Sequence, residues 1–133
     1  MQCRASLSAW QKASSGVAVR VCLGDPDSEA VLRRGREEGI GEEGIASRCR
    51  LAIGYARPVQ RADRGAIRTT GATLYSSVLR FDDELLINTH LWGNAAADSP
   101  VFHLRRRDDR GIAASVLRSF ERVWEEAQPA SAG

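Results

Sequence analysis

The feature that most constrains the fold is a change of hydrophobic spacing near Gly65. Before this point apolar residues recur mainly at helical intervals, and after it come short runs of β-branched and aromatic residues separated by turn signals. The segment 111–127 returns to the helical period, with apolar residues on one face at Val116, Leu117, Phe120, Val123 and Trp124. This alternation predicts a sheet with helices packed on it, in an α/β or α+β fold.

The order of elements follows from the same pattern. We expect a helix over 7–15, a strand over 17–24 and a helix that starts at Glu29 after a cap at Asp27 or Ser28. The β-branched run at 17–24 is typical of a strand buried on both faces of a parallel or mixed sheet. Glycines between 35 and 44 indicate a flexible break before a helix over 42–55, which Arg57-Pro58 should end. Four strands are expected within 66–107, and Asp82-Asp83 indicates a hairpin turn between the middle two.

Length and composition exclude several classes of protein. The 133 residues suffice for one domain, and we expect 128–133 to be a frayed tail. The sequence contains no run of 18 apolar residues, so no membrane span is expected. The N-terminus lacks a secretory pattern, so we expect a cytoplasmic protein. A net charge of +2 does not favour direct DNA binding. The three cysteines, without a CxxC motif, predict neither a disulfide framework nor a metal site, and no cofactor is expected; Cys22 and Cys49 are interpreted as small core residues.

The stretch 74–94, LYSSVLRFDDELLINTHLWGN, carries the strongest functional signal. It predicts a strand, an acidic turn and a second strand that ends in polar residues. The arrangement resembles the phospholipase D-like superfamily, in which a strand bearing HxKxxxxD precedes a strand ending in a GSxN segment. In that pattern Tyr75 takes the histidine position, Ser77 the lysine position and Asp82 the aspartate position. Asn88 and His90 then fall near the GSxN segment.

Four short motifs extend the resemblance over residues 16–127: LGDP, LYxSxxRxDDE, NTH and SFERVW. Together they resemble a bacterial domain family of unknown function, a degenerate phospholipase D-like unit usually found C-terminal to Xre-type helix-turn-helix transcriptional regulators. The resemblance implies a mixed sheet flanked by helices, as one domain over 16–127 between a helical extension at 1–15 and a disordered tail at 128–133. The family's usual first strand has no counterpart in 1–15, which would leave an open sheet edge that a second copy could pair in a homodimer.

Two replacements decide the expected chemistry. The phenol of Tyr75 has a reference pKa of about 10 and the hydroxyl of Ser77 carries no charge, so neither can do the work of the family's histidine and lysine. We therefore expect a non-catalytic ligand-sensing or dimerisation domain associated with transcriptional regulation. It would work with a helix-turn-helix partner, since the chain shows no DNA-binding module of its own. Its candidate site for a small anionic ligand comprises Asp25, Tyr75, Ser77, Asp82, Asn88 and His90.

The alternative is a phosphodiesterase or hydrolase-like enzyme that uses Tyr75 or His90. A Ser77/His90/Asp82 triad can be assembled on paper, but the chain has no GxSxG nucleophile elbow. Purely structural roles for three of these residues stay open beside the functional ones. Asp25 could simply bond its own turn, Asp82 could belong only to the hairpin, and His90 could be structural.

Overall fold

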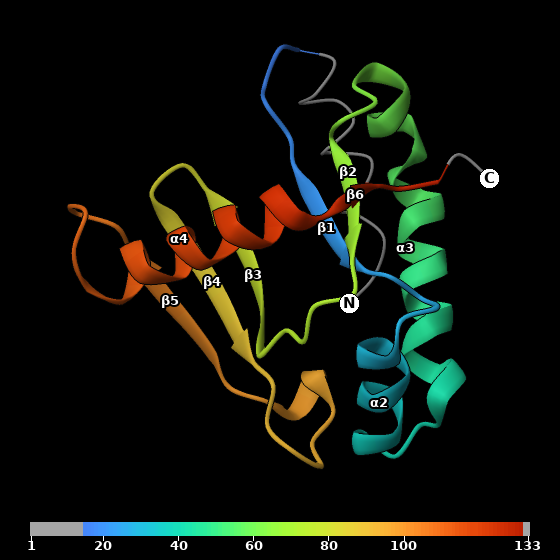
Figure 1. Cartoon of the computed structure of the whole chain (residues 1–133). Helices are drawn as coiled ribbons and strands as arrows, with labels where there is room; N and C mark the ends of the chain where they lie inside the picture. The colour runs from blue at the N-terminus through green and yellow to red at the C-terminus, as the bar shows by residue number, and fades with distance from the viewer. Residues whose placement is uncertain (1–14, 132–133) are drawn as a thin grey trace.

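The computed structural model describes residues 15–131 as a mixed α/β arrangement of two small sheets and, in this part of the chain, three α-helices (Figure 1). The first sheet has the order β1-β2-β6 and the second the order β3-β4-β5. The strands are β1 (Val21–Gly24), β2 (Ile67–Thr70), β3 (Ser76–Phe81), β4 (Glu84–Thr89), β5 (Val101–Arg105) and β6 (Gln128–Pro129). The helices are α2 (Glu29–Glu37), α3 (Glu42–Ala62) and α4 (Gly111–Glu126), with a short 3-10 turn, η1 (Ala96–Asp98), in the β4–β5 loop. The mixed α/β class is as predicted, but two sheets stand where one was expected.

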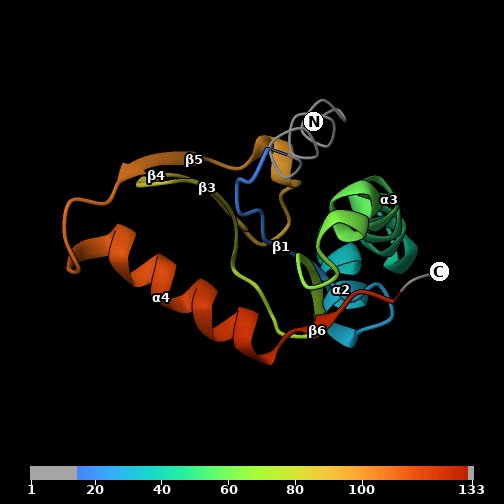
Figure 2. The ribbon, with the colours of Figure 1, turned by 90° about the horizontal axis from the view of Figure 1, so that it is seen from above.

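The first sheet lies between α3 and the C-terminal end of α4 (Figure 2). β1 and β2 run parallel, with Val21 opposite Ile67 and Cys22 opposite Arg68. Because side chains alternate between faces, Ile67 packs into a cluster with Val59 of α3, whereas Arg68 points to the other face and stacks on Trp124 of α4. The Arg68 guanidinium lies 4.5 Å from that ring and its Nη1 donates to the carbonyl of Trp124 at 2.7 Å. α4 is thereby fixed to β2.

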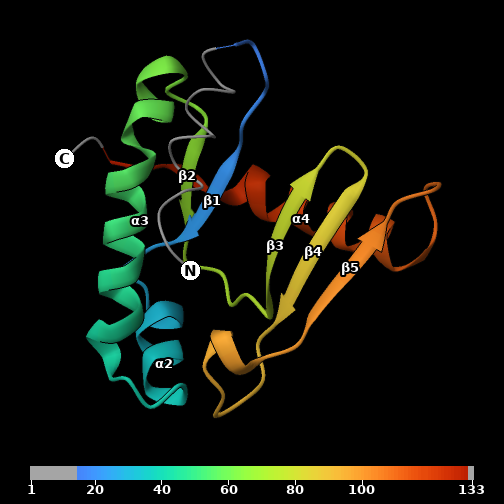
Figure 3. The same cartoon turned by 180° about the vertical axis from the view of Figure 1, so that it is seen from behind.

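The second sheet is an antiparallel meander with α4 on one face. Leu85 and Ile87 of β4 are buried there against Ala113 and Leu117 of α4. The register places Ser77, Leu79 and Phe81 of β3 on the opposite face, beside the alternate residues of β4 and β5. Within residues 15–131 no helix packs on that face, which Figure 3 views directly. Leu79, Phe81 and Val101 are consequently exposed on it, and we call it the open face.

The joint between α2 and α3 is a tight turn. Ser28 caps α2 through its hydroxyl, which accepts from the N–H of Val31. The helix ends at Glu37, and Gly39 and Gly41 adopt φ angles of 72° and 78°, a backbone region that favours glycine. Gly35 lies inside α2 and is buried where the backbone of Gly41 crosses it. The break predicted from the glycines is therefore present, as a short packed turn.

Three boundaries differ from the sequence predictions. β1 begins only at Val21 and is half-buried, because it is an edge strand with a neighbour on one side. α3 continues through Pro58 to Ala62, so the predicted end was wrong; Val59, one residue beyond the proline, is buried against the first sheet and this packing holds the last turn in place. The segment predicted to fray forms β6 on β2, where Ala130 is buried. The helix predicted at 7–15 lies, up to residue 14, outside the described residues.

Candidate functional site

Two of the predicted site residues, Ser77 and His90, meet on the open face, at the end of the second sheet that is within electrostatic range of α2. Ser77 on β3 pairs across the strands with Asn88, and Tyr75 is opposite His90 in the continuation of the same ladder, where the His90 N–H donates to the Tyr75 carbonyl at 2.9 Å. Ser77 and His90 are therefore diagonal neighbours on one face. The Oγ of Ser77 lies 3.0 Å from Nε2 of His90, and Nδ1 of His90 lies 3.1 Å from the carbonyl oxygen of Leu74.

These two contacts determine which ring nitrogen of neutral His90 carries the proton. A carbonyl oxygen can only accept, so Nδ1 must donate to Leu74. Nε2 is then the unprotonated nitrogen of the neutral ring and accepts the hydroxyl proton of Ser77. The resulting order, hydroxyl to imidazole to carbonyl, is that of a nucleophile, a general base and an orienting group.

The surroundings favour the neutral form of His90. Partial burial lowers its pKa below the ordinary value of 6.5, the hydrogen bond to Leu74 opposes this shift, and the charge of Arg34 lowers the pKa further while that of Glu38 raises it. Both of these charged residues belong to the C-terminal end of α2. α2 is thus within electrostatic reach of the Ser77–His90 pair.

Arg34 and Glu38 form an ion pair that is almost fully removed from solvent. Nε of Arg34 donates to Oε1 of Glu38 at 2.6 Å, and the two side chains are 15% and 3% exposed. Nη2 of Arg34 and Oε2 of Glu38 are also buried, yet neither has a hydrogen-bond partner. Unpaired buried polar atoms cost free energy, so this pair is incompletely satisfied by the protein alone.

The other predicted site residues are engaged in holding loops. Oδ1 of Asp25 accepts from the N–H of Asp27, which is the hydrogen bond expected if Asp25 serves its own turn. The amide of Asn88 donates to the carbonyls of Ala96 and Ser99 and so closes the β4–β5 loop. Asp82 sits in the hairpin turn with a φ of 54°. It is five residues along β3 from Ser77, roughly 16 Å at the usual rise, so a triad with Ser77 and His90 does not form.

Large side chains around the Ser77–His90 pair face solvent. Tyr75 is 80% exposed and Trp92 82% exposed, and Leu91 between His90 and Trp92 is exposed as well. His103, the other histidine, lies at the far end of the open face, where its Nε2 is 2.6 Å from Oε2 of Glu84. Its predicted direction, opposite to Phe102 and Leu104, is confirmed.

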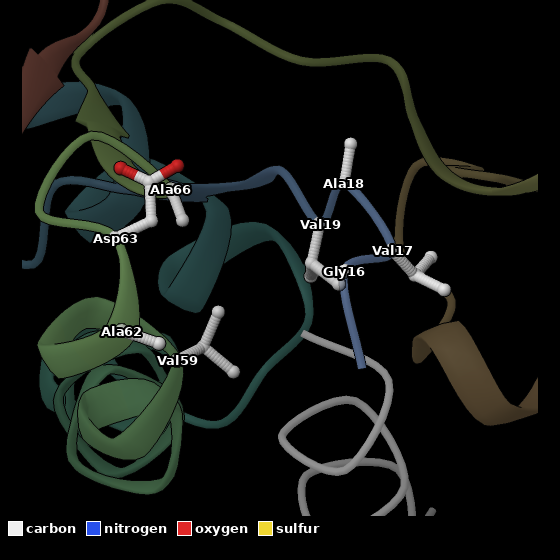
Figure 4. A pocket seen from close by; sticks show the side chains of 8 residues that line it. All are labelled: Gly16, Val17, Ala18, Val19, Val59, Ala62, Asp63 and Ala66. Atoms are coloured by element: carbon white, nitrogen blue, oxygen red, sulfur yellow. The ribbon is translucent and has the colours of Figure 1, made fainter. Parts of the chain in front are cut away.

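A pocket of about 190 Å³ lies away from this site, between the extended segment 16–19 and the C-terminal end of α3 (Figure 4). Its lining is apolar apart from Asp63, whose Oδ1 accepts from the N–H of Gly65. None of the predicted site residues lines it.

Cysteines and acidic residues offer no metal centre in the part of the chain that the structure describes. No group of three His, Cys, Asp or Glu side chains comes close enough there to hold an ion. Cys22 and Cys49 are half-buried free thiols, and burial raises the pKa of each above its ordinary value. Among residues 15–131, no helix has both the length and the apolar character needed to cross a bilayer.

Sequence reasoning did not single out Arg34 and Glu38. Their i,i+4 spacing on a helix predicts an ion pair, but such pairs are usually exposed. Their burial depends on how α2 docks, which no local pattern encodes.

Comparisons of the chain with protein-family models, with curated proteins and with solved structures find no match.

Proposed function

We propose that this chain is a ligand-sensing domain of degenerate phospholipase D-like type that serves a transcriptional regulator. The observation that carries the proposal is the incompletely satisfied Arg34–Glu38 pair next to His90. Nη2 of Arg34 and Oε2 of Glu38 are both buried, so a small anionic ligand would reach them only when α2 shifts locally. Its anionic group would then give Nη2 of Arg34 an acceptor, and a hydroxyl or amino group of the same ligand would donate to Oε2 of Glu38. Arginine suits phosphate or carboxylate recognition because its planar donors match two oxygens.

The chemistry of the site supports a role without the phospholipase D reaction. The hydroxyl of Ser77 is hydrogen-bonded to His90, where the superfamily pattern has a lysine ammonium, and the exposed phenol of Tyr75 stands where that pattern has the histidine nucleophile. Neither group supplies positive charge to a transferred phosphoryl group.

Dimerisation is the second part of the proposal, and the open face supports it. Leu79 and Phe81 of β3 and Val101 of β5 expose apolar side chains on this face, on the two strands that flank β4. Exposed apolar side chains gathered on one face are typical of an association site. β3 and β5 are also edge strands within residues 15–131, with backbone groups that another strand could pair.

Thermal unfolding with inorganic phosphate, nucleoside monophosphates and cyclic nucleotides tests ligand binding. A ligand at 100 times its Kd stabilises the folded state by about 2.7 kcal/mol, which raises Tm by several degrees. Arg34→Gln should abolish the shift, because it removes the guanidinium that would bind the anion, whereas Arg33→Gln, the matched control at the exposed arginine next to it in α2, should retain it. Sedimentation over a range of concentrations tests dimerisation. A monomer at every concentration that also binds none of these anions contradicts the proposal.

A hydrolase is the second candidate function, favoured by the hydrogen bonds from Ser77 to His90 and from His90 to Leu74. A route in which the phenol of Tyr75 takes up the phosphoryl group, with Arg68 or Arg80 supplying the positive charge, has less support. Arg68 is stacked on Trp124, and Nε of Arg80 donates to the carbonyl of Asp82 at the far end of the hairpin. Turnover of bis(4-nitrophenyl) phosphate that Tyr75→Phe abolishes would restore that route.

A further inference from the structure

We propose that Ser77 is an acyl-accepting nucleophile activated by His90, and that the open face hydrolyses small carboxylic esters. The inference rests on the second candidate function and gives it a nucleophile and a substrate class. Three groups stand in the required order: an exposed hydroxyl, an imidazole whose Nε2 accepts its proton, and a carbonyl that holds the ring through Nδ1. No carboxylate is needed for this order, because the Leu74 carbonyl orients the ring.

The reaction balances with water as the only co-substrate. Oγ of Ser77 attacks the ester carbonyl carbon while Nε2 of His90 takes the hydroxyl proton. The bond from that carbon to the alcohol oxygen breaks, and the alcohol leaves with the electron pair and the proton from His90. Water then attacks the acyl-Ser77 ester and gives up a proton to His90. The acid is released as Ser77 takes the proton back.

The register supplies backbone donors next to the nucleophile. Since Tyr75 and Ser77 are hydrogen-bonded to β4, the N–H groups of Ser76 and Val78 point away from β4, off the free edge of β3. The N–H of Val78 follows the nucleophile directly. A tetrahedral intermediate at the edge of the sheet could place its oxyanion against this donor.

The exposed side chains around the pair indicate the substrate. Tyr75 stands opposite His90 in the ladder, and Leu91 and Trp92 follow His90, all three with large exposed apolar surfaces. We therefore expect uncharged esters with an apolar acyl or aryl group, rather than phosphodiesters.

Covalent labelling of the whole chain tests the inference. The probes are a fluorophosphonate, which traps nucleophilic serines, and 4-nitrophenyl acetate; intact mass and peptide mapping locate the adduct. We expect one adduct, on Ser77, and a burst of nitrophenolate. Ser77→Ala should remove both, and His90→Gln should slow labelling by about 10²-fold or more, the usual contribution of a general base.

The chain provides matched controls. Ser76→Ala changes the adjacent serine, which the register places on the opposite face, and His103→Gln changes the other histidine; both variants should label at the wild-type rate. The labelling rate should rise with pH and level off below the pH expected of an unshifted imidazole, since the neutral ring is the base. Within the described residues, the groups that act on it are Ser77 of β3, the Leu74 carbonyl, Arg34 of α2 and Glu38, which caps the C-terminal end of α2.

Several results would overturn the inference. An unlabelled wild-type chain, an adduct on Tyr75 or a cysteine in place of Ser77, or labelling that His90→Gln leaves unchanged would each do so. Because the wild-type adduct is read directly, the test does not depend on how well a variant folds. The phosphate-induced Tm shift is measured separately, so loss of ester chemistry with retained anion binding refutes only this inference and leaves the ligand-sensing proposal standing.

Discussion

Replacing Gly35 by alanine should destabilise the fold although the residue lies inside a helix. A Cβ at this position would lie 2.1 Å from the carbonyl oxygen of Gly41 and 3.0 Å from that of Glu42. Both obstacles are backbone atoms at the start of α3, which cannot rotate away as the end of a flexible side chain can. The variant must therefore move α2 away from α3 or distort the turn that joins them.

The magnitude follows from two opposing effects. Alanine in place of glycine favours a helix by about 1 kcal/mol, whereas forcing an extra group into a packed site costs about 1–3 kcal/mol or more. Gly54 in α3 separates the two effects, because a Cβ there meets nothing within 4 Å. Gly54→Ala should stabilise the protein by about 1 kcal/mol. The difference between the variants then measures the clash alone, about 1–3 kcal/mol in favour of Gly54→Ala.

Urea unfolding followed by circular dichroism measures this difference, with the m-value checked for constancy. Thermal melts should separate the two variants by roughly 4 °C or more, since 1 kcal/mol corresponds to about 4 °C in a domain of this size. If Gly35→Ala is as stabilising as Gly54→Ala, the close crossing of α2 and the start of α3 does not exist. The positions assigned to Arg34 and Glu38 would then fail with it.

Three further outcomes are expected. Trp124→Ala should cost about 3–5 kcal/mol in urea unfolding, because the buried ring carries Arg68; Trp92→Ala, at an exposed ring, should stay within about 0.5 kcal/mol. The pKa of His90 is lowered in the folded protein, so the stability that the neutral ring contributes is present above pH 6.5 and is lost as the pH falls through the folded pKa. Tm should decline over that pH range, and His90→Gln should flatten this part of the profile. Truncation after residue 127 should lower Tm, because β6 and buried Ala130 are lost; an unchanged Tm would show that β6 contributes nothing.

Local signals predicted the parts of the fold that local physics determines. Ser28 caps α2 because a hydroxyl at that position can reach the N–H of Val31. Asp82 and Asp83 turn the hairpin, and a two-residue turn alone sets Ser77 opposite Asn88. The adjacency of Ser77 and His90 follows from that register. Half of the candidate site was therefore within reach of the sequence.

The rest depends on contacts between distant segments. Pro58 reads locally as a helix end, but burial of Val59 against the first sheet outweighs the lost hydrogen bond. The polar sequence after 127 gives no strand signal, and β6 exists only because β2 offers it an edge. Burial of the Arg34–Glu38 pair likewise follows from the docking of α2. The i,i+4 spacing predicts the ion pair, whereas its burial, which is unusual for such a pair, depends on the tertiary arrangement.

The long helix α4 touches both sheets, and the two clusters of buried residues share no member. One cluster lies between α3 and the first sheet, and the other between α4 and the second. Amide hydrogen exchange should therefore resolve two protected blocks that open with different free energies. The stacked Arg68 and Trp124 couple these blocks, so loosening that stack would let the sheets exchange independently. With the stack in place, α4 connects the two sheets, and binding at one sheet would change how readily the other opens.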